Sequence, residues 1–193
     1  DPDNWFELGA CSDQPVASLD TVLMRKDPPF DTEYTYATYI LERAEEQGCL
    51  IVNKPQSLRD ANEKLFTAWF SEFTPTTLVT RSSDKICAFH QTHGDIILKP
   101  LDGMGGESIF RLEPDDPNLN VILETITSKD RELVMVQRYI PEITAGDKRI
   151  LVVNGEPVPY ALARYAGKGD FRGNLAKGGT SKGVPLSERD RWI

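Results

Sequence analysis

Hydrophobic and polar residues near the start of the chain follow the pattern of a strand, a helix and a second strand. The apolar run DTVLM at 20–24 predicts a buried strand, and LIV at 50–52 predicts another. Between them, apolar side chains recur with helical spacing, in a helix that can begin at Asp31 or Thr32 and end at Gly48. Two strands joined by a helix favour a parallel sheet in this part of the chain.

The rest of the chain predicts more helices and a sheet with antiparallel strands. The expected helices cover 62–73, 84–93, 118–127 and a last one starting after Ser187, and the expected strands cover 76–80, 96–99, 108–112 and 132–136. Residues 149–153 and 158–164 flank Asn154-Gly155, a dipeptide that supplies the positive φ angles of a tight hairpin turn. We therefore expect an α/β chain, α+β in its second part, with a domain boundary near residues 61–63.

Composition narrows the class of protein. The chain has 193 residues, 39% of them hydrophobic, and 22 Lys and Arg against 30 Asp and Glu give a net charge of −8. Such a composition is typical of soluble globular proteins, and no apolar run approaches the roughly 20 residues of a membrane span. Because affinity for nucleic acids and anionic membranes depends on Lys and Arg, the charge argues against both as partners.

The cysteines and histidines do not form a recognisable metal site. Cys11, Cys49 and Cys87 contain no CxxC pair, which favours reduced, packed thiols in a cytoplasmic protein. His90 and His93 share one predicted helix, and no carboxylate or cysteine completes a ligand set. We therefore expect both histidines on the surface.

The strongest local signal is the glycine loop, residues 102–106 (DGMGG). Glycines let backbone N–H groups approach phosphate oxygens closely. The loop matches neither G-x-G-x-x-G nor the Walker pattern and lies between two predicted strands, so it is either a flap over a nucleotide or a plain hairpin. Lys99 ends the strand before it, where its ammonium can reach a bound phosphate or remain solvated.

Further cations follow. Arg149 and Arg164 lie on the two arms of the predicted hairpin, where they can converge on one anion or pair across the strands with a carboxylate such as Asp147. The basic loop, residues 166–184, holds Arg172 and Lys177 among its glycines and is either a lid or a solvated loop. Cation-bearing glycine loops beside an antiparallel sheet suit transfer of a phosphoryl group to a carboxylate.

Several stretches closely resemble the prokaryotic glutathione synthetases, a family of the ATP-grasp superfamily. They are residues 22–48, 52–70, 96–112, 116–127, 146–164 and 172–179, with MRKDPPFD, DGMGG and RGNLAKGG as the most specific motifs. The resemblance implies an ATP-grasp fold preceded by a parallel-sheet substrate domain. It also implies ATP-dependent joining of γ-glutamylcysteine to glycine, through an acyl phosphate, with Mg²⁺ as metal and a homo-oligomer as the full-length state.

The same resemblance implies roles for individual residues. The nucleotide side comprises Lys64, Lys99, Gly103, Met104, Gly105 and Gly106, together with Gln137, Arg138, Tyr139 and Ile140, which hold the adenine edge by their backbone. The catalytic cations are Arg149 and Arg172, and the substrate side comprises Arg25, Asp147 and Arg164. Residues 172–179 match a mobile loop over the acyl phosphate.

Family members extend beyond both ends of this sequence. We therefore expect residues 1–62 to be the remainder of the substrate domain and residues 63–193 a truncated ATP-grasp domain. The Mg²⁺ ligands are expected beyond residue 193, so the fragment alone is expected to be inactive. Two alternatives stay open: another ATP-grasp carboxylate–amine ligase, or a noncatalytic nucleotide-binding module.

Overall fold

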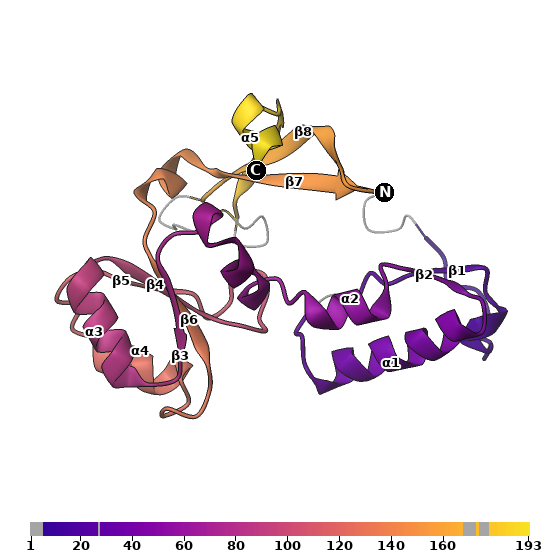
Figure 1. Cartoon of the computed structure of the whole chain (residues 1–193), viewed down its shortest axis with the longest axis horizontal. Coiled ribbons are helices and arrows are strands. Elements are labelled where there is room, and N and C mark those ends of the chain that lie inside the picture. The colour runs from indigo at the N-terminus through magenta and orange to yellow at the C-terminus, as the bar shows by residue number, and fades with distance from the viewer. Residues whose placement is uncertain (1–5, 27, 168–172, 174–177) are drawn as a thin grey trace. The chain divides into compact units, whose positions relative to one another are not determined.

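The computed structural model describes residues 6–26, 28–167, 173 and 178–193 (Figure 1). Contacts between Cα atoms divide the chain into two compact units, Asp1–Ala61 and Asn62–Ile193. Each unit is described by itself below.

The first unit contains the expected strand–helix–strand arrangement. Strand β1 (Thr21–Leu23) pairs in parallel with β2 (Leu50–Val52), and α1 (Thr32–Glu46) connects them, after a short 3-10 helix η1 (Val16–Ser18). Helix α1 begins where the Asp31 carboxylate accepts the Tyr34 N–H at 2.8 Å. Leu41 and Ala44 of the helix pack against Cys49 and Ile51. The parallel pairing that the sequence predicts is therefore confirmed.

Helix α2 (Pro55–Asp60) was not expected from the sequence. Its six residues are too few to show helical periodicity, and Arg59 fixes it on α1. The Arg59 guanidinium donates to both carboxylate oxygens of Glu42 at 2.9 Å and to the Thr38 hydroxyl at 3.1 Å. The helix thus depends on a long-range ion pair that local patterns do not contain.

The second unit is built on an antiparallel sheet of order β3-β6-β4-β5 (Figure 1). Its strands are β3 (Thr77–Thr80), β4 (Ile96–Pro100), β5 (Phe110–Leu112) and β6 (Val134–Arg138). Helices α3 (Ser83–His93) and α4 (Leu119–Ile126) pack on one face of this sheet. There Ile86 and Leu123 meet Ile96, Leu98 and Val136 in a core that excludes water.

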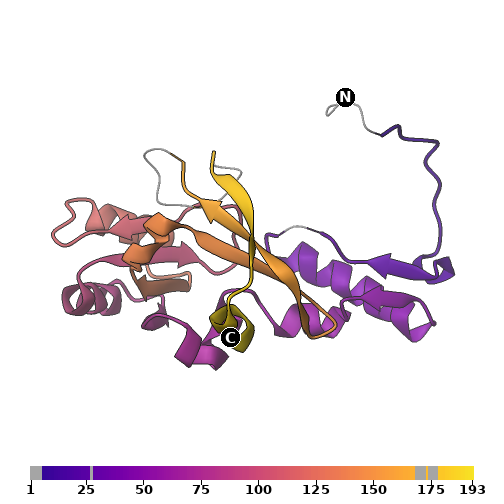
Figure 2. The same cartoon turned by 90° about the horizontal axis from the view of Figure 1, so that it is seen from above.

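A second sheet joins β7 (Asp147–Val153), β8 (Glu156–Tyr165) and β9 (Thr180–Pro185), all antiparallel (Figure 2). Asn154 and Gly155 have φ values of 50° and 82°, which confirms the predicted hairpin. The short 3-10 helix η3 (Pro141–Ala145) leads into β7, and α5 (Glu188–Trp192) follows β9. Ser187 begins α5 with a reciprocal capping box to Asp190, as expected.

Three expectations are wrong. Residues 62–73 form no regular α-helix, because η2 (Leu65–Phe73) is a 3-10 helix kinked at Phe70, and the Thr67 hydroxyl bonds the carbonyl of Lys64 at 2.6 Å. The end of the basic loop is strand β9, whose ladder with β8 no local pattern shows. His90 is buried, with Nε2 3.0 Å from the Glu113 carbonyl oxygen, so it belongs to the core.

Gly146, between η3 and β7, occupies a position that admits no side chain. Its φ is +95° and its ψ is 172°, a region open essentially to glycine alone. A Cβ built there would lie 2.6 Å from the Arg164 carbonyl oxygen and 2.9 Å from the Tyr165 ring. This close approach is what lets β7 start directly beside the end of β8.

We expect Gly146→Ala to lower the free energy of unfolding by about 3 kcal/mol or more, because backbone strain adds to a clash with main-chain atoms. Gly155→Ala is the matched control, since Gly155 also has positive φ but nothing lies within 4 Å of its Cβ position. The control should lose about 1 kcal/mol. Urea unfolding of the two variants measures the difference, and equal losses would contradict the steric argument.

Candidate functional site

Strand alternation separates the core of the second unit from its functional face. Successive side chains of a strand point to opposite faces, so Ile96 and Leu98 enter the core while Ile97 and Lys99 lie on the other face of β4. Ile97 is paired with Arg111 of β5 and with Gln137 of β6. Paired residues share a face, so these side chains line one surface opposite helices α3 and α4.

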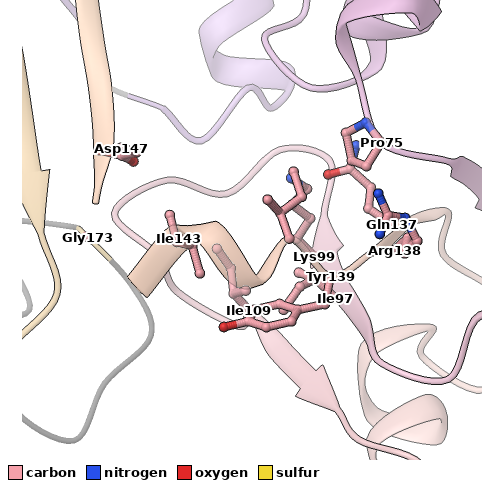
Figure 3. Close-up of a pocket in the computed structure, with 11 residues that line it drawn as sticks. Pro75, Ile97, Lys99, Ile109, Gln137, Arg138, Tyr139, Ile143, Asp147 and Gly173 are labelled. Atoms are coloured by element: carbon pink, nitrogen blue, oxygen red, sulfur yellow. The ribbon is translucent and has the colours of Figure 1, made fainter. Parts of the chain in front are cut away.

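A pocket of about 270 Å³ opens on that surface (Figure 3). Figure 3 shows the ring of Tyr139 beside Ile97 and Ile109. The lining residues are Pro75, Ile97, Lys99, Ile109, Gln137, Arg138, Tyr139, Ile140, Ile143, Asp147 and Gly173. A mostly apolar lining with a few polar groups is typical of small-molecule sites, and its flat aliphatic walls suit an aromatic base.

Residues 138–140, which we call the base-binding segment because they belong to the stretch expected to hold an adenine edge, form one edge of the pocket. The Tyr139 amide donates to the Asp95 carbonyl at 2.9 Å, and the Ile140 carbonyl accepts from Ile143 at 3.1 Å. The Ile140 amide donates to none of the residues that the structure describes. This leaves one backbone donor beside an apolar pocket, as recognition of a base edge requires.

Two lysines converge beside the pocket. Burial lowers the pKa of Lys99 from its ordinary value of 10.5, and the nearby charge of Lys64 lowers it further, against a smaller opposite effect of Glu63. Burial also lowers the pKa of Lys64, which Glu63 and Asp102 oppose. Within the described residues, Lys99 makes no ion pair. An anion placed between the two ammonium groups would relieve both costs.

The glycine loop lies within reach of these lysines. The Lys64 ammonium donates a hydrogen bond to the Gly103 carbonyl. Gly105 and Gly106 have φ values of 66° and 79°, so the turn needs residues without a Cβ, and Met104 is exposed. The sequence of this loop is compatible with both a flap and a plain hairpin. In the structure the loop contacts the ammonium group of Lys64.

Arg164 and Arg149 differ in their surroundings. Arg164 donates to the two carboxylate oxygens of Asp147 at 2.8 and 2.7 Å, and these bonds raise its pKa. Cross-strand pairing, one of the two arrangements considered from the sequence, is therefore what the structure contains. Arg149 is exposed, lies opposite Leu162, and makes no ion pair with a described residue. Asp147 lines the pocket, and Arg149 follows it on the same strand face.

Three expected cations lie outside the described part of the second unit. Arg172 and Lys177 lie outside the described residues, and Arg25 lies in the first unit, exposed after β1. The apolar wall formed by Pro75, Ile109 and Ile143 was missed, because apolar residues carry no chemical signature in a sequence. One signal in the sequence was available: Ile97 lies between two core residues of β4, so strand alternation places this apolar side chain on the face opposite the core.

No group of three His, Cys, Asp or Glu side chains in the described part of the chain could hold a metal ion. These side chains therefore do not fit a Mg²⁺ site. In the same part of the chain, no helix is both long and apolar enough to cross a membrane.

Two family models together match nearly the whole chain. A family model described as "Prokaryotic glutathione synthetase, ATP-grasp domain" matches residues 63–193, and one described as "Prokaryotic glutathione synthetase, N-terminal domain" matches residues 1–59. The chain is 70% identical to a glutathione synthetase of Shewanella oneidensis and 66% identical to one of Yersinia pestis. Each alignment covers 98% of this chain but 60% of the relative.

Among solved structures, the fold is similar to that of a D-cycloserine synthetase, with a TM-score of 0.66 at 14% identity. That match covers 92% of this chain and 63% of the other, and shows the fold alone. Together with the family match, it confirms the expected α/β architecture of the ATP-grasp type.

Substitution of Lys99 tests whether the charge of this partly buried lysine destabilises the folded protein. The folded protein lowers the pKa of Lys99, so the charged form destabilises the fold at pH 7, and this cost disappears as pH rises through the lowered pKa toward 10.5. We expect Lys99→Met to raise the midpoint of thermal unfolding at pH 7, with an advantage over wild type that shrinks at alkaline pH.

Lys85→Met, on the exposed surface of α3, is the control for loss of a lysine charge and should change the midpoint little at any pH. Calorimetry of the full-length gene product at pH 7 and pH 10 gives the comparison. A destabilised Lys99→Met protein would show that the lysine is structural.

Proposed function

The chain belongs to the prokaryotic glutathione synthetase family, and we propose that it forms the nucleotide-binding part of an ATP-dependent ligase that joins γ-glutamylcysteine to glycine. The observation that carries this proposal is the 66 to 70% identity, over nearly all of the chain, to relatives named glutathione synthetase. The chain spans about 60% of the length of those relatives, so the activity is proposed for the full-length gene product.

ATP is proposed to enter with its base in the pocket. The adenine ring would lie between the aliphatic side chains of Ile97, Ile109 and Ile143, with its edge at the Ile140 amide. The triphosphate would then extend toward Lys99 and Lys64, whose pKa values are lowered chiefly by burial, and its negative charge would compensate the two ammonium groups. The glycine loop would close over the phosphates with backbone N–H groups.

Two steps complete the proposed reaction. A carboxylate oxygen of γ-glutamylcysteine attacks the γ-phosphorus, the bond to the bridging oxygen breaks, and ADP leaves. The glycine amine then attacks the carbonyl carbon of the acyl phosphate, inorganic phosphate leaves, and the nitrogen loses a proton. In both steps the chain neutralises and orients oxygens. Lys99 and Arg149 suit this role because they make no ion pair with a described residue. Lys64 suits it because its ion pair with Glu63 is long, at 3.8 Å.

The substrate side of the site is proposed to include Arg149 and the Asp147–Arg164 pair. The Asp147–Arg164 pair is already neutral, so it would orient a substrate group by hydrogen bonds while Arg149 supplies the net charge. Arg25 in the first unit and Arg172 in the basic loop retain the substrate-binding and catalytic roles that the resemblance implies. Because the described side chains do not fit a Mg²⁺ site, no step above uses a metal.

Activity of the full-length gene product tests the proposal. ADP should form only when ATP, γ-glutamylcysteine and glycine are all present, and mass spectrometry should detect glutathione in equal amount. Replacing the dipeptide by D-alanine tests the alternative of another carboxylate–amine ligase. ADP formation with D-alanine alone, or ATP binding without turnover of any acid, would contradict the proposal.

We expect Lys99→Met to lower kcat/KM for ATP about 100-fold, because one cation that neutralises transferring oxygens is removed. The surface variant Lys85→Met should retain wild-type kcat/KM. Steady-state kinetics with saturating dipeptide and glycine measure both. A loss of less than threefold in Lys99→Met would remove this lysine from the phosphate site.

A further inference from the structure

Arg111 of β5 makes a set of contacts that the proposed reaction does not use. Its guanidinium donates to the Asp95 carboxylate at 2.6 and 3.0 Å, and an oxygen of Glu113 lies 3.2 Å away. The Arg111 Cζ also lies 4.0 Å from the centre of the Tyr139 ring. The side chains of Arg111 and Asp95 are 30% and 29% exposed, so both are partly withdrawn from water.

Asp95 holds Tyr139 in two independent ways. Its carbonyl oxygen accepts the Tyr139 amide at 2.9 Å, and its carboxylate fixes the guanidinium that lies against the Tyr139 ring. The backbone and the side chain of Tyr139 are therefore both anchored to the residue that immediately precedes β4. The next residue is Ile140, which lines the pocket and whose amide donates to none of the described residues.

The position of Arg111 in the sheet gives these contacts a second consequence. Strand β5 is an edge strand of the sheet, and it pairs with β4 at three positions, of which Arg111–Ile97 is the middle one. The glycine loop connects β4 to β5, so its return arm is held by this short ladder. The contact of Arg111 with Tyr139 ties the returning strand directly to the base-binding segment.

We propose that Arg111 is a positioning residue that, clamped by Asp95, fixes Tyr139 and thereby aligns the base-binding segment with the glycine loop. This inference rests on the proposed function, since it assumes that the pocket receives a nucleotide base. Arg111 touches neither the base nor the phosphates; it acts through the Tyr139 ring. Its loss should therefore weaken recognition of the base and leave the phosphate contacts of Lys64 and Lys99 in place.

Equilibrium binding of two ligands separates these effects in the full-length gene product. Arg111→Met should weaken ADP binding about tenfold, the range expected for loss of a partly desolvated cation–π contact. Binding of inorganic tripolyphosphate, which has no base, should stay within twofold of wild type. In turnover, KM for ATP should rise about tenfold with kcat changed less than threefold. Arg111→Lys keeps the charge but not the planar fork, and should lie in between.

Two further variants keep the interpretation unambiguous. Arg131→Met removes an exposed arginine whose bonds are local, and should bind both ligands as wild type does. The Arg111→Met change leaves the Asp95 carboxylate without its guanidinium partner. The double variant Arg111→Met, Asp95→Asn also removes that carboxylate, and it should still bind ADP weakly. Restored ADP binding in the double variant would overturn the inference, because the defect would then come from the unpaired charge of Asp95.

The remaining outcomes are equally decisive. Unchanged ADP binding in Arg111→Met, or equal loss of ADP and tripolyphosphate binding, would overturn the positioning role while leaving the proposed function intact. Wild-type protein that binds neither ligand would contradict the proposed function, and this inference with it.

Discussion

The second unit depends on one geometric constraint, the position of β4 between two strands, with one face in the hydrophobic core and the other at the pocket. This strand is hydrogen-bonded on both edges, and its alternating side chains must serve two opposite surfaces at once. Because Ile96 and Leu98 point into the hydrophobic core, Ile97 and Lys99 must point to the opposite face of the sheet. A shift of one residue in the register would bury the lysine among helices and expose the core, which is why packing and function specify the same register.

The site is assembled from elements that lower stability when considered alone. Lys64 and Lys99 carry charge into a partly buried region, and the glycine loop adopts backbone angles that other residues avoid. The hydrophobic core on the opposite face offsets these costs, since helices α3 and α4 bury large aliphatic side chains there. The proposed nucleotide would supply negative charge to both lysines and an acceptor for the Ile140 amide, which donates to none of the described residues.

Sequence patterns predicted the elements whose causes are local. The first strand–helix–strand unit, the Asn-Gly hairpin and the Ser187 cap all follow from periodicity or turn chemistry within a few residues. The strand β9 and the burial of His90 depend on partners distant in sequence, namely β8 and the Glu113 carbonyl. The site divides in the same way: Lys99 and the glycine loop stand out by residue type, whereas the aliphatic walls and the Arg111–Tyr139 contact depend on strand register.

The close approach at Gly146 limits how this gene can change. Every missense substitution of a single nucleotide in a glycine codon introduces a residue with a Cβ, and the Arg164 carbonyl oxygen already occupies the space that this atom would need. Because the obstacle is main chain, no exchange of a neighbouring side chain can remove it. At this codon only synonymous substitutions leave the junction between η3 and β7 intact. Other positions of the hairpin can therefore change in evolution only in ways compatible with glycine at position 146.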